Sequence, residues 1–354
     1  MEIYRKTYAN IHLSNIEHNV REITDHFNDF DYYFGVVKAD CYGHKGIEPV
    51  KSIIAGGVNY LAVIELEEAL YIRSHLHDIP ILCMGVVSPE AVGTAVRHNI
   101  TLTINSLETL NGYLKTTPKD LKVHIKINTG MNRLGLNAKD ELSETLKKLS
   151  ANGITVEGIY THIYNAYSES DTQKQFELFE KIPEDMDLNE IPIRHIQASD
   201  ALCKYEKPSY VNACRLGIIM YGLGDTDLNL KSSLSLHSEI IQIHHLTKGE
   251  NVGYGDTYHA PDDEIIAVVP IGYADGIIRK NTGRHVYIND MPCPIVGNIC
   301  MDHLFVRIDD TIKLHDEVLL IKDNNHIERI AKHLDTISYE VLTSIGSRVP
   351  RVYK

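Results

Sequence analysis

A lysine at the end of an apolar run is the residue whose placement most directly indicates chemistry. Residues 32–37, Tyr-Tyr-Phe-Gly-Val-Val, are typical of a buried strand, and Lys38 follows them directly. Burying an ammonium group is costly unless it is paired or neutralised, so packing alone seldom selects lysine there. Burial lowers the pKa of a lysine, and its neutral amine can form a Schiff base with an aldehyde. The alternative is a lysine whose charged end reaches solvent from the strand end.

The composition excludes several classes of protein. The 354 residues are 43% hydrophobic, enough for a sizeable core, and the formal net charge of -13 makes nucleic acid an unexpected partner. The six cysteines form no CxxC pair and the histidines no HExxH spacing, so we expect neither a disulfide framework nor a metal site. We find no signal-peptide pattern and no apolar segment of membrane-spanning length, and we therefore expect a cytoplasmic protein without a membrane partner.

Strand and helix patterns alternate up to residue 225. Eight apolar strand patterns separated mainly by helical ones predict a (β/α)8 TIM-type barrel, so the fold class is α/β over residues 1–225. A further strand over residues 5–13 precedes them and is a candidate to pair with a second domain. The expected barrel strands are 32–37, 60–64, 79–85, 101–104, 122–127, 156–161, 195–198 and 214–221. The expected helices include 15–27, 65–75, 89–98, 106–115, 140–152 and 172–181.

The pattern changes near residue 225. Short strands separated by turn signals predict a second, mainly β domain over residues 226–354, with one helix over residues 328–334. The expected strands are 235–246, 265–269, 285–288, 303–308 and 318–321. In the barrel, reactive groups belong at the C-terminal ends of the strands, and those ends carry Lys38, His162, Ser199 and Arg215. The fold alone does not specify a function.

Six segments resemble motifs of the alanine racemase family, which uses pyridoxal 5′-phosphate (PLP), in the same order along essentially the whole chain. They are residues 36–44, 128–135, 215–222, 252–255, 270–276 and 297–302. The resemblance implies a PLP-binding barrel followed by a C-terminal β domain. It also implies an amino-acid racemase that interconverts L- and D-alanine and supplies D-alanine for peptidoglycan synthesis.

The resemblance implies two catalytic residues on opposite faces of the substrate. Lys38 would hold PLP as a Schiff base and serve one face of the substrate Cα. Tyr254 would serve the other face from the partner subunit, which implies a homodimer with shared active sites. A tyrosine with an ordinary pKa of about 10 is a poor base at neutral pH. His162 matches the residue that supports it and would connect Tyr254 to Arg215. Without the surrounding Val-Gly-Tyr-Gly, Tyr254 would be interpreted as an ordinary turn tyrosine.

Arg215 matches the residue that faces the pyridine nitrogen of the cofactor. Arginine stays protonated and cannot accept a proton, so this nitrogen would stay unprotonated and transamination would be disfavoured. An acidic residue there would suit a PLP-dependent decarboxylase, a competing reading with the same two-domain architecture. His195 is expected to orient Arg215 from behind. The alternative for Arg215 is a surface salt bridge, against which its apolar neighbours Leu216 and Ile218 argue.

The resemblance also implies the groups that bind the cofactor phosphate. These are the hydroxyls of Tyr42 and Ser199 and the backbone N–H groups of Gly217 and Ile218. Backbone N–H groups at the start of a helix suit an anion. Ser199 also fits a plain helix N-cap, and both roles are compatible.

Five residues match the substrate side of the family's site. Arg133 and the backbone of Met301 match the groups that bind the substrate carboxylate, for which a bidentate arginine is well suited. Tyr273 matches a residue at the substrate entrance, and Asp302 is expected to support its neighbour Met301. Lys126 matches a lysine that is often carbamylated in the family and that positions Arg133.

Two positions depart from the family pattern. Asn128 stands where the family usually has aspartate, and Ser347 stands where it commonly has a tyrosine that packs beside the cofactor and reaches its phosphate. Serine leaves a larger and more polar space, so a serine or broad-specificity racemase is the alternative substrate assignment.

Two further alternatives are a single-barrel PLP-binding protein, which lacks a counterpart of residues 226–354, and a barrel without PLP, which would be colourless.

Overall fold

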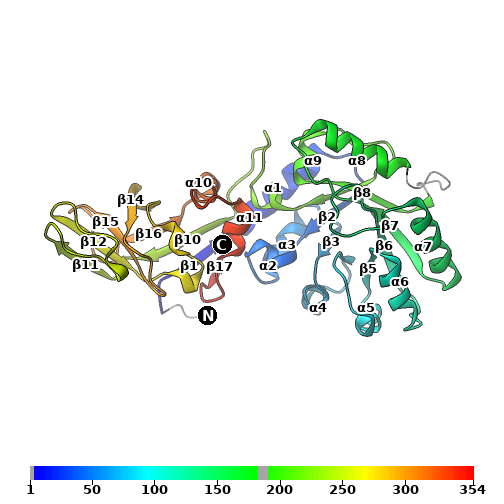
Figure 1. Ribbon diagram of the computed structural model, residues 1–354, viewed down its shortest axis with the longest axis horizontal. Coiled ribbons are helices and arrows are strands. Elements are labelled where there is room, and N and C mark those ends of the chain that lie inside the picture. Colours follow the sequence, from blue (N-terminus) through cyan, green and yellow to red (C-terminus); the bar gives the residue numbers. More distant parts are fainter. Residues whose placement is uncertain (1–3, 182–189) are drawn as a thin grey trace.

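The chain folds into two lobes, shown in Figure 1 by a computed structural model that describes residues 4–181 and 190–354. One lobe is a closed barrel of eight strands, and the other is built around a nine-stranded sheet. The predicted fold class, a (β/α)8 barrel followed by a mainly β domain, is confirmed. The domain boundary placed at residues 225 and 226 stays a prediction.

All neighbouring strands of the barrel are parallel, and the pairing of β2 with β9 closes it. Most strand residues are buried, as expected for a parallel barrel that helices cover from outside. The strands are β2 (Tyr32–Val36), β3 (Tyr60–Val63), β4 (Ile81–Cys83), β5 (Ile100–Ile104), β6 (Lys122–Lys126), β7 (Thr155–Tyr160), β8 (Ile193–Ala198) and β9 (Ala213–Leu216). The helices are α1 (Leu13–His26), α3 (Glu48–Ala55), α4 (Leu66–His75), α5 (Val92–Arg97) after η1 (Pro89–Ala91), α6 (Leu107–Leu114), α7 (Lys139–Ala151), α8 (Glu169–Lys181) and α9 (Ser199–Lys204).

The eighth barrel strand is shorter than predicted. The sequence predicts a strand over residues 214–221, but β9 ends at Leu216 and a 3-10 turn, η3 (Ile218–Tyr221), follows. Gly217 separates them with φ −113° and ψ −116°, outside the strand region. A continuous apolar run carries no periodicity that would distinguish a buried strand from a buried turn. The break lies at the mouth of the barrel, beside the cavity described below.

A left-handed turn, α2 (Lys38–Tyr42), follows the first barrel strand and was not predicted. Its residues 39–42 all have φ between 51° and 54°, although none is a glycine. Each such residue costs about 1–2 kcal/mol relative to a right-handed turn. Gly43 ends the turn with φ 80°, and a Cβ there would lie 2.4 Å from the carbonyl oxygen of Leu342. The turn brings Lys38 and Tyr42 into one cavity.

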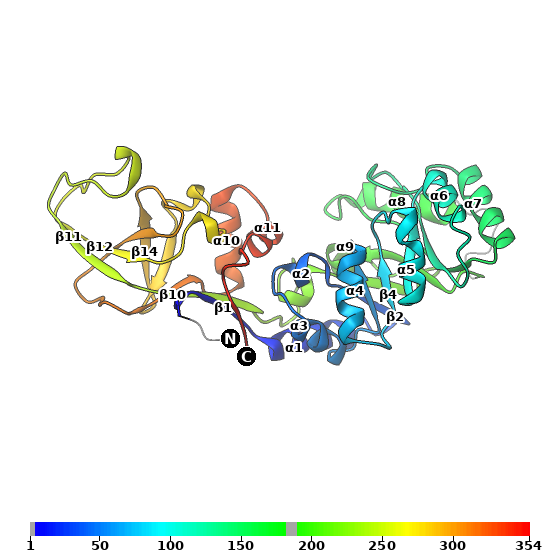
Figure 2. The ribbon, with the colours of Figure 1, turned by 90° about the horizontal axis from the view of Figure 1, so that it is seen from below.

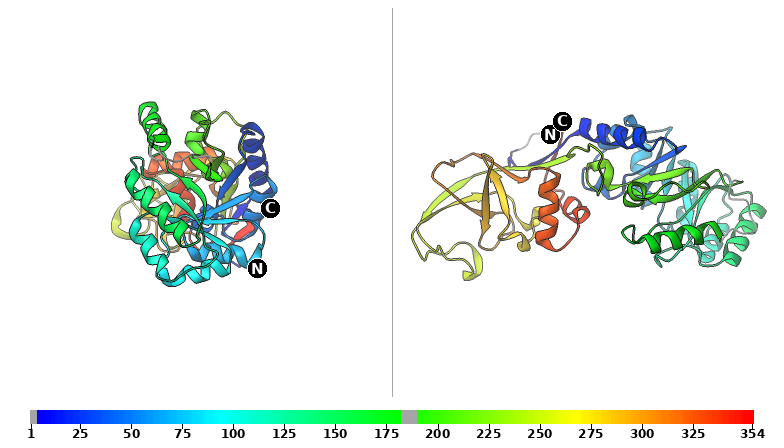
Figure 3. Two further views of the ribbon diagram at one scale, coloured as in Figure 1. Left: turned by 90° about the vertical axis from the view of Figure 1, so that its right-hand side faces the viewer. Right: turned by 90° about the horizontal axis from the view of Figure 1, so that it is seen from above.

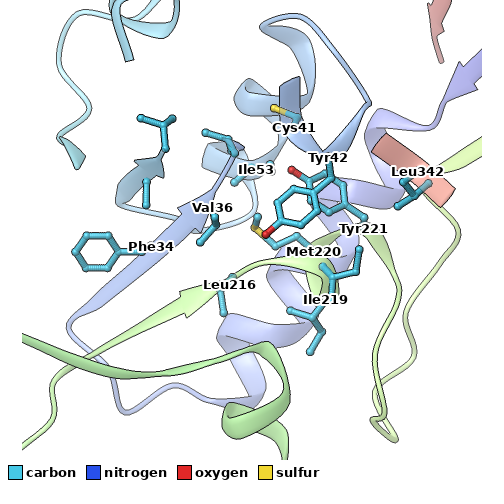
Figure 4. Close-up of a cluster of buried hydrophobic side chains, with 14 of the residues drawn as sticks. Phe34, Val36, Cys41, Tyr42, Ile53, Leu216, Ile219, Met220, Tyr221 and Leu342 are labelled. Atoms are coloured by element: carbon cyan, nitrogen blue, oxygen red, sulfur yellow. The ribbon is translucent and has the colours of Figure 1, made fainter. Parts of the chain in front are cut away.

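Apolar packing holds this strained turn. Tyr42 and Tyr221 have ring centroids 5.0 Å apart, and Leu342 of α11 (Ser338–Thr343) lies nearby (Figure 4). Helix α11 belongs to the C-terminal part of the chain, so the second lobe contributes to the packing of the barrel mouth.

The sheet of the second lobe combines strands from both ends of the chain. Strand β1 (Tyr8–Ile11) pairs antiparallel with β10 and parallel with β17 (Arg351–Tyr353), so the chain starts in this sheet before it enters the barrel (Figure 2). The sheet order is β11-β12-β15-β14-β13-β16-β10-β1-β17. The remaining strands are β10 (Leu234–Glu239), β11 (Gln242–Leu246), β12 (Glu264–Val269), β13 (His285–Ile288), β14 (Met291–Val296), β15 (Leu304–Ile308) and β16 (Glu317–Ile321).

The sequence prediction for this lobe missed strands β14 and β17 and helix α11, and two of the predicted elements have other bounds. The strand expected over residues 235–246 is interrupted at Ile240 and Ile241 and forms β10 and β11, which have different partners in the sheet. Helix α10 (Asn324–Leu334) begins earlier than predicted, because the Asp323 carboxylate accepts from the backbone N–H of His326 and caps it. Helices α10 and α11 lie where the two lobes meet (Figure 3).

Among residues 4–181 and 190–354, no helix is both long and apolar enough to cross a membrane.

Candidate active site

A cavity of about 610 Å³ lies at the C-terminal end of the barrel strands. This volume is within the range of small-molecule sites. The residues that line it include most barrel residues singled out from the sequence: Lys38, Tyr42, Lys126, Arg133, His162, Ser199, Arg215 and Gly217. Within the described ranges there is no group of three or more His, Cys, Asp or Glu side chains placed to hold a metal ion.

Lys38 presents an amine that is easier to deprotonate than an ordinary lysine. Burial lowers its pKa, the positive charge of Arg133 lowers it further, and the Glu68 carboxylate opposes this. Lys38 is half-buried, and no ion pair among the described residues includes it, so no opposite charge stabilises its ammonium form directly. A lysine with a lowered pKa is a better nucleophile at neutral pH.

Arg215 is buried and contacts neutral acceptors. Its Nη1 lies 2.7 Å from Nδ1 of His195, and its Nη2 donates to the carbonyl oxygens of Thr161 and Ile196, both at 2.8 Å. Nδ1 of His162 lies 3.3 Å from the same Nη2. Burial lowers the pKa of Arg215 to about 10, so the guanidinium stays charged at neutral pH. The alternative interpretation of Arg215 as a surface salt bridge is wrong.

Tyr42, Ser199 and Gly217 enclose a small polar space. The N–H of Gly217 donates to Oγ of Ser199 over 3.1 Å. A Cβ at residue 217 would lie 3.0 Å from the Tyr42 hydroxyl and 3.3 Å from Oγ of Ser199, so only glycine leaves this space open. Ser199 is not an N-cap, because α9 begins at Ser199 itself and Ala198 precedes it. Ile218 follows in η3 and is buried.

Lys126, at the end of β6, is buried among positive charges. Its Nζ lies 5.6 Å from the ring centroid of Tyr160. Burial lowers the pKa of Lys126 to about 8, and the charges of Arg133, Arg215 and Lys38 contribute to the decrease. Part of the Lys126 population is therefore neutral at neutral pH, which is the form that reacts with carbon dioxide.

Asn128 organises the loop that carries Arg133. Its Oδ1 accepts from the N–H groups of Gly130 and Asn132, as an aspartate could. Its Nδ2 donates to Oδ1 of Asn132 and of Asn137, which an aspartate could not do. The departure from the family pattern at this position thus preserves the loop contacts and adds two.

The remaining predicted residues lie in the sheet lobe, away from the barrel cavity. Tyr254, Tyr273, Met301 and Asp302 line a second cavity of about 660 Å³. Tyr254 is 75% exposed and Met301 53% exposed, although both side chains are largely apolar. Exposed apolar side chains gathered in one place are typical of a surface that another molecule covers. Within one chain, the structure does not bring Tyr254 together with Lys38.

Ser347 is exposed and lines neither cavity. The next residue, Arg348, donates to Asp302 over 2.7 Å and lies 3.4 Å from the Asp275 carboxylate, which also pairs with Arg5 at 2.9 Å. These ion pairs fix the position of Ser347 relative to the residues of the second cavity.

The residues that line the cavity but were not predicted from the sequence include two buried or half-buried tyrosines, Tyr160 and Tyr339. Tyr160 lies beneath both Lys126 and Arg215, and it stands two residues before His162, a period-2 spacing that could have indicated it. Tyr339 of α11 reaches the cavity beside Tyr42, with ring centroids 5.9 Å apart. Its contact joins distant parts of the chain, and nothing in the local sequence signals it.

This architecture defines a (β/α)8-barrel enzyme with a separate β domain. The sequence pattern of the alanine racemase N-terminal domain matches residues 11–225, and that of the alanine racemase C-terminal domain matches residues 233–353. The chain therefore belongs to the alanine racemase family.

Individual relatives agree with this assignment over nearly the whole chain. The alanine racemase of Halalkalibacterium halodurans is 35% identical, and the match covers 99% of this chain and 95% of the relative. The crystal structure of alanine racemase from Bacillus anthracis with bound L-Ala-P superposes with a TM-score of 0.93 at 32% identity, over 100% of this chain and 96% of the other. Alanine racemase from Bartonella henselae with covalently bound pyridoxal phosphate has a TM-score of 0.90 at 26% identity, over 99% of each chain.

Proposed function

We propose that the chain interconverts L- and D-alanine with PLP attached to Lys38. The family and its relatives support the reaction on alanine, whose D-enantiomer is used in peptidoglycan synthesis. The observation that carries the cofactor assignment is a single cavity that holds a deprotonatable lysine, a donor-only arginine and a glycine-sized polar space. The decarboxylase alternative requires an acidic partner for the pyridine nitrogen, and the Arg215 side chain occupies the buried position instead.

The cavity residues fit PLP in both charge and size. Tyr42, Ser199 and the backbone of Gly217 would hold the phosphate, because hydroxyl and backbone N–H groups donate hydrogen bonds to an anion. Arg215 would donate a hydrogen bond to the pyridine nitrogen and would not protonate it. When bound, PLP supplies an electron sink that makes the Cα proton of the attached amino acid removable.

Two side chains of this protein would move the proton. Lys38, whose pKa burial lowers, is a suitable base for one face of Cα. Tyr254 would act on the opposite face, and His162, which contacts Arg215, would support it. Arg133 and the backbone of Met301 would orient the substrate carboxylate.

These assignments require a homodimer. Tyr254 and Met301 line a cavity of the sheet lobe, and Lys38 lines the barrel cavity of the same chain. A head-to-tail dimer would set the sheet lobe of one chain against the barrel of the other and would cover the exposed Tyr254 ring.

We also propose that Lys126 is carbamylated, because a carbamate would replace one of several adjacent positive charges by a negative one that can hold Arg133.

A methyl group added at residue 217 tests the phosphate site. We expect Gly217→Ala to weaken PLP binding by about 10- to 100-fold, since overpacking costs about 1–3 kcal/mol and the added Cβ would meet the Tyr42 and Ser199 hydroxyls. The measurement is a titration of the apoprotein with PLP, followed by absorbance. Gly93→Ala is the control, because its Cβ would meet only the end of the Arg97 side chain at 3.5 Å. An unchanged PLP affinity in Gly217→Ala would place the phosphate elsewhere.

We propose that Ser347 influences substrate choice in the dimer, because within one chain it lines neither cavity. We expect Ser347→Tyr to lower the ratio of serine to alanine kcat/KM by about tenfold or more, because one small group in a pocket is worth about 1–3 kcal/mol. The ratio is measured with a chiral product assay on both amino acids. Ser347→Ala is the matched control, because it removes the hydroxyl without adding a ring. If Ser347→Tyr leaves the ratio unchanged, Ser347 does not determine specificity.

A further inference from the structure

A polar column crosses the interior of the barrel behind Arg215. From Nη1 of Arg215 it continues to His195, whose Nε2 lies 3.0 Å from Nδ1 of His124. It ends at Glu157, whose Oε2 lies 3.6 Å from Nε2 of His124. Barrel interiors are usually filled by branched aliphatic side chains, so a chain of buried polar groups here needs a reason.

The chemistry of Arg215 fixes the direction of every contact in this column. A guanidinium can only donate, so Nδ1 of His195 accepts. Burial lowers the pKa of both histidines, and the charge of Arg215 adds to this. Glu157 opposes the decrease at His124, but the pKa of His124 still lies below its ordinary value, so both rings are neutral at neutral pH. A neutral His195 that accepts at Nδ1 must donate from Nε2 to His124. His124 then carries its own proton on Nε2, the nitrogen that faces Glu157.

Packing holds the two rings in this geometry. His195 is sandwiched between Phe34 and Tyr160, with ring centroids 4.6 Å away on each side and interplanar angles of 12°. Next to His124 the chain has Gly158, where a Cβ would lie 2.4 Å from Cε1 of the imidazole. The two rings cannot rotate to other partners without moving several side chains.

The far end of the column is a carboxylate. Oε2 of Glu157 accepts from the Tyr60 hydroxyl over 2.6 Å and from the Thr101 hydroxyl over 2.9 Å. Burial would raise the pKa of Glu157, but the nearby His124, whose Nε2 lies 3.6 Å away and makes no hydrogen bond, and the hydrogen bonds from Tyr60 and Thr101 lower it to about 2. Glu157 is therefore ionised at neutral pH, although only 21% of its side chain is exposed.

Among the described residues, no carboxylate contacts the charge of Arg215 directly. None of the ion pairs in the described parts of the chain includes Arg215, and the groups that contact it are carbonyl oxygens and histidines. A buried charge is costly unless another group offsets it. Polar chains in a low-dielectric interior polarise one another, so Glu157 can act through the two imidazoles.

We propose that Glu157 is a positioning residue that serves as the remote counter-charge of Arg215 through His124 and His195. It stabilises the tautomers that make His195 accept from Arg215, and it offsets part of the guanidinium charge in front of the cofactor ring. This inference rests on the proposed function in one respect, because the cofactor assignment supplies the ring that Arg215 faces.

The variants Glu157→Gln and Glu157→Asp separate charge from hydrogen bonding. Glutamine keeps an acceptor oxygen and removes the charge, whereas aspartate keeps the charge on a shorter side chain. We expect Glu157→Gln to lower kcat for alanine about tenfold with little change in KM, by analogy with the groups that orient metal ligands, whose loss typically costs about 10- to 100-fold. Glu157→Asp should retain more of the activity. Glu144→Gln, which removes an exposed carboxylate of α7, should match the unmodified protein.

The histidine tautomers provide a readout that does not depend on the cofactor. Nitrogen-15 NMR of the unmodified apoprotein should show His124 and His195 neutral and protonated on Nε2, and Glu157→Gln should shift the resonance of the accepting Nδ1 of His195. A protonated Nδ1 on His195, or a resonance and kcat that Glu157→Gln leaves unchanged, would overturn the proposal. If Glu157→Gln does not fold, the proposal is tested by the activity of Glu157→Asp and by the tautomers of His124 and His195 in the unmodified protein. Failure to bind PLP would instead count against the proposed function alone.

Discussion

Replacing Lys38 by alanine is expected to lower kcat/KM for alanine by at least about 10³-fold. The change removes both the attachment point of the cofactor and the base for one face of the substrate, and a positioned acid–base group alone contributes about 10²- to 10⁴-fold. The measurement is a chiral assay of D-alanine formation at saturating PLP, so that weaker cofactor binding does not account for the loss.

Cofactor attachment is checked on the unmodified protein in the same series. Borohydride reduction followed by peptide mapping should place the pyridoxyl group on Lys38. Lys45→Ala is a matched control, because Lys45 lies in the same segment but outside the barrel cavity. Labelling at another lysine, or near-normal activity of Lys38→Ala, would remove Lys38 from the mechanism.

Mixing two inactive variants is expected to restore activity if the sites are shared. Tyr254→Phe alone should lose about 10²- to 10⁴-fold in kcat, since it removes the second acid–base group. In a heterodimer with Lys38→Ala, one site combines the intact Lys38 of one chain with the intact Tyr254 of the other. Random reassociation of equal amounts would give about a quarter of the normal activity.

The reassociation experiment has a built-in control. Each variant unfolded and refolded alone should stay inactive, so any recovery comes from heterodimers. No recovery after mixing, with heterodimers demonstrated by mass spectrometry, would mean that Lys38 and Tyr254 act within one chain and that the two cavities approach each other by a movement of the lobes.

The barrel and its site were predictable because strand ends locate side chains. Lys38 and His162 stand two residues after the ends of β2 and β7, and the C-terminal ends of parallel strands meet at one mouth. The break at Gly217 was not predictable, because an apolar run such as 214–221 lacks a distinguishing period. The left-handed turn at residues 39–42 is held by tertiary packing and leaves no glycine signature in the sequence.

Contacts between distant segments were also beyond the sequence. Tyr339 reaches the barrel cavity from a helix that follows the last long strand of the sheet lobe. Glu157 lies near the start of its strand, on the side away from the cavity. Functional residues of (β/α)8 barrels are expected at the C-terminal ends of the strands, so the sequence did not indicate Glu157. Its connection to Arg215 exists only because four strands place their inward side chains in successive layers.

The fate of L-alanine incubated with the purified protein and PLP in deuterium oxide tests the proposed racemisation. Racemisation by removal and return of the Cα proton requires L- and D-alanine to reach equal amounts, with deuterium at Cα of the D-alanine formed and no accumulation of pyruvate. These products are measured together by chiral chromatography and mass spectrometry. Pyruvate as the main product, or no D-alanine from a protein that has bound PLP, would contradict it.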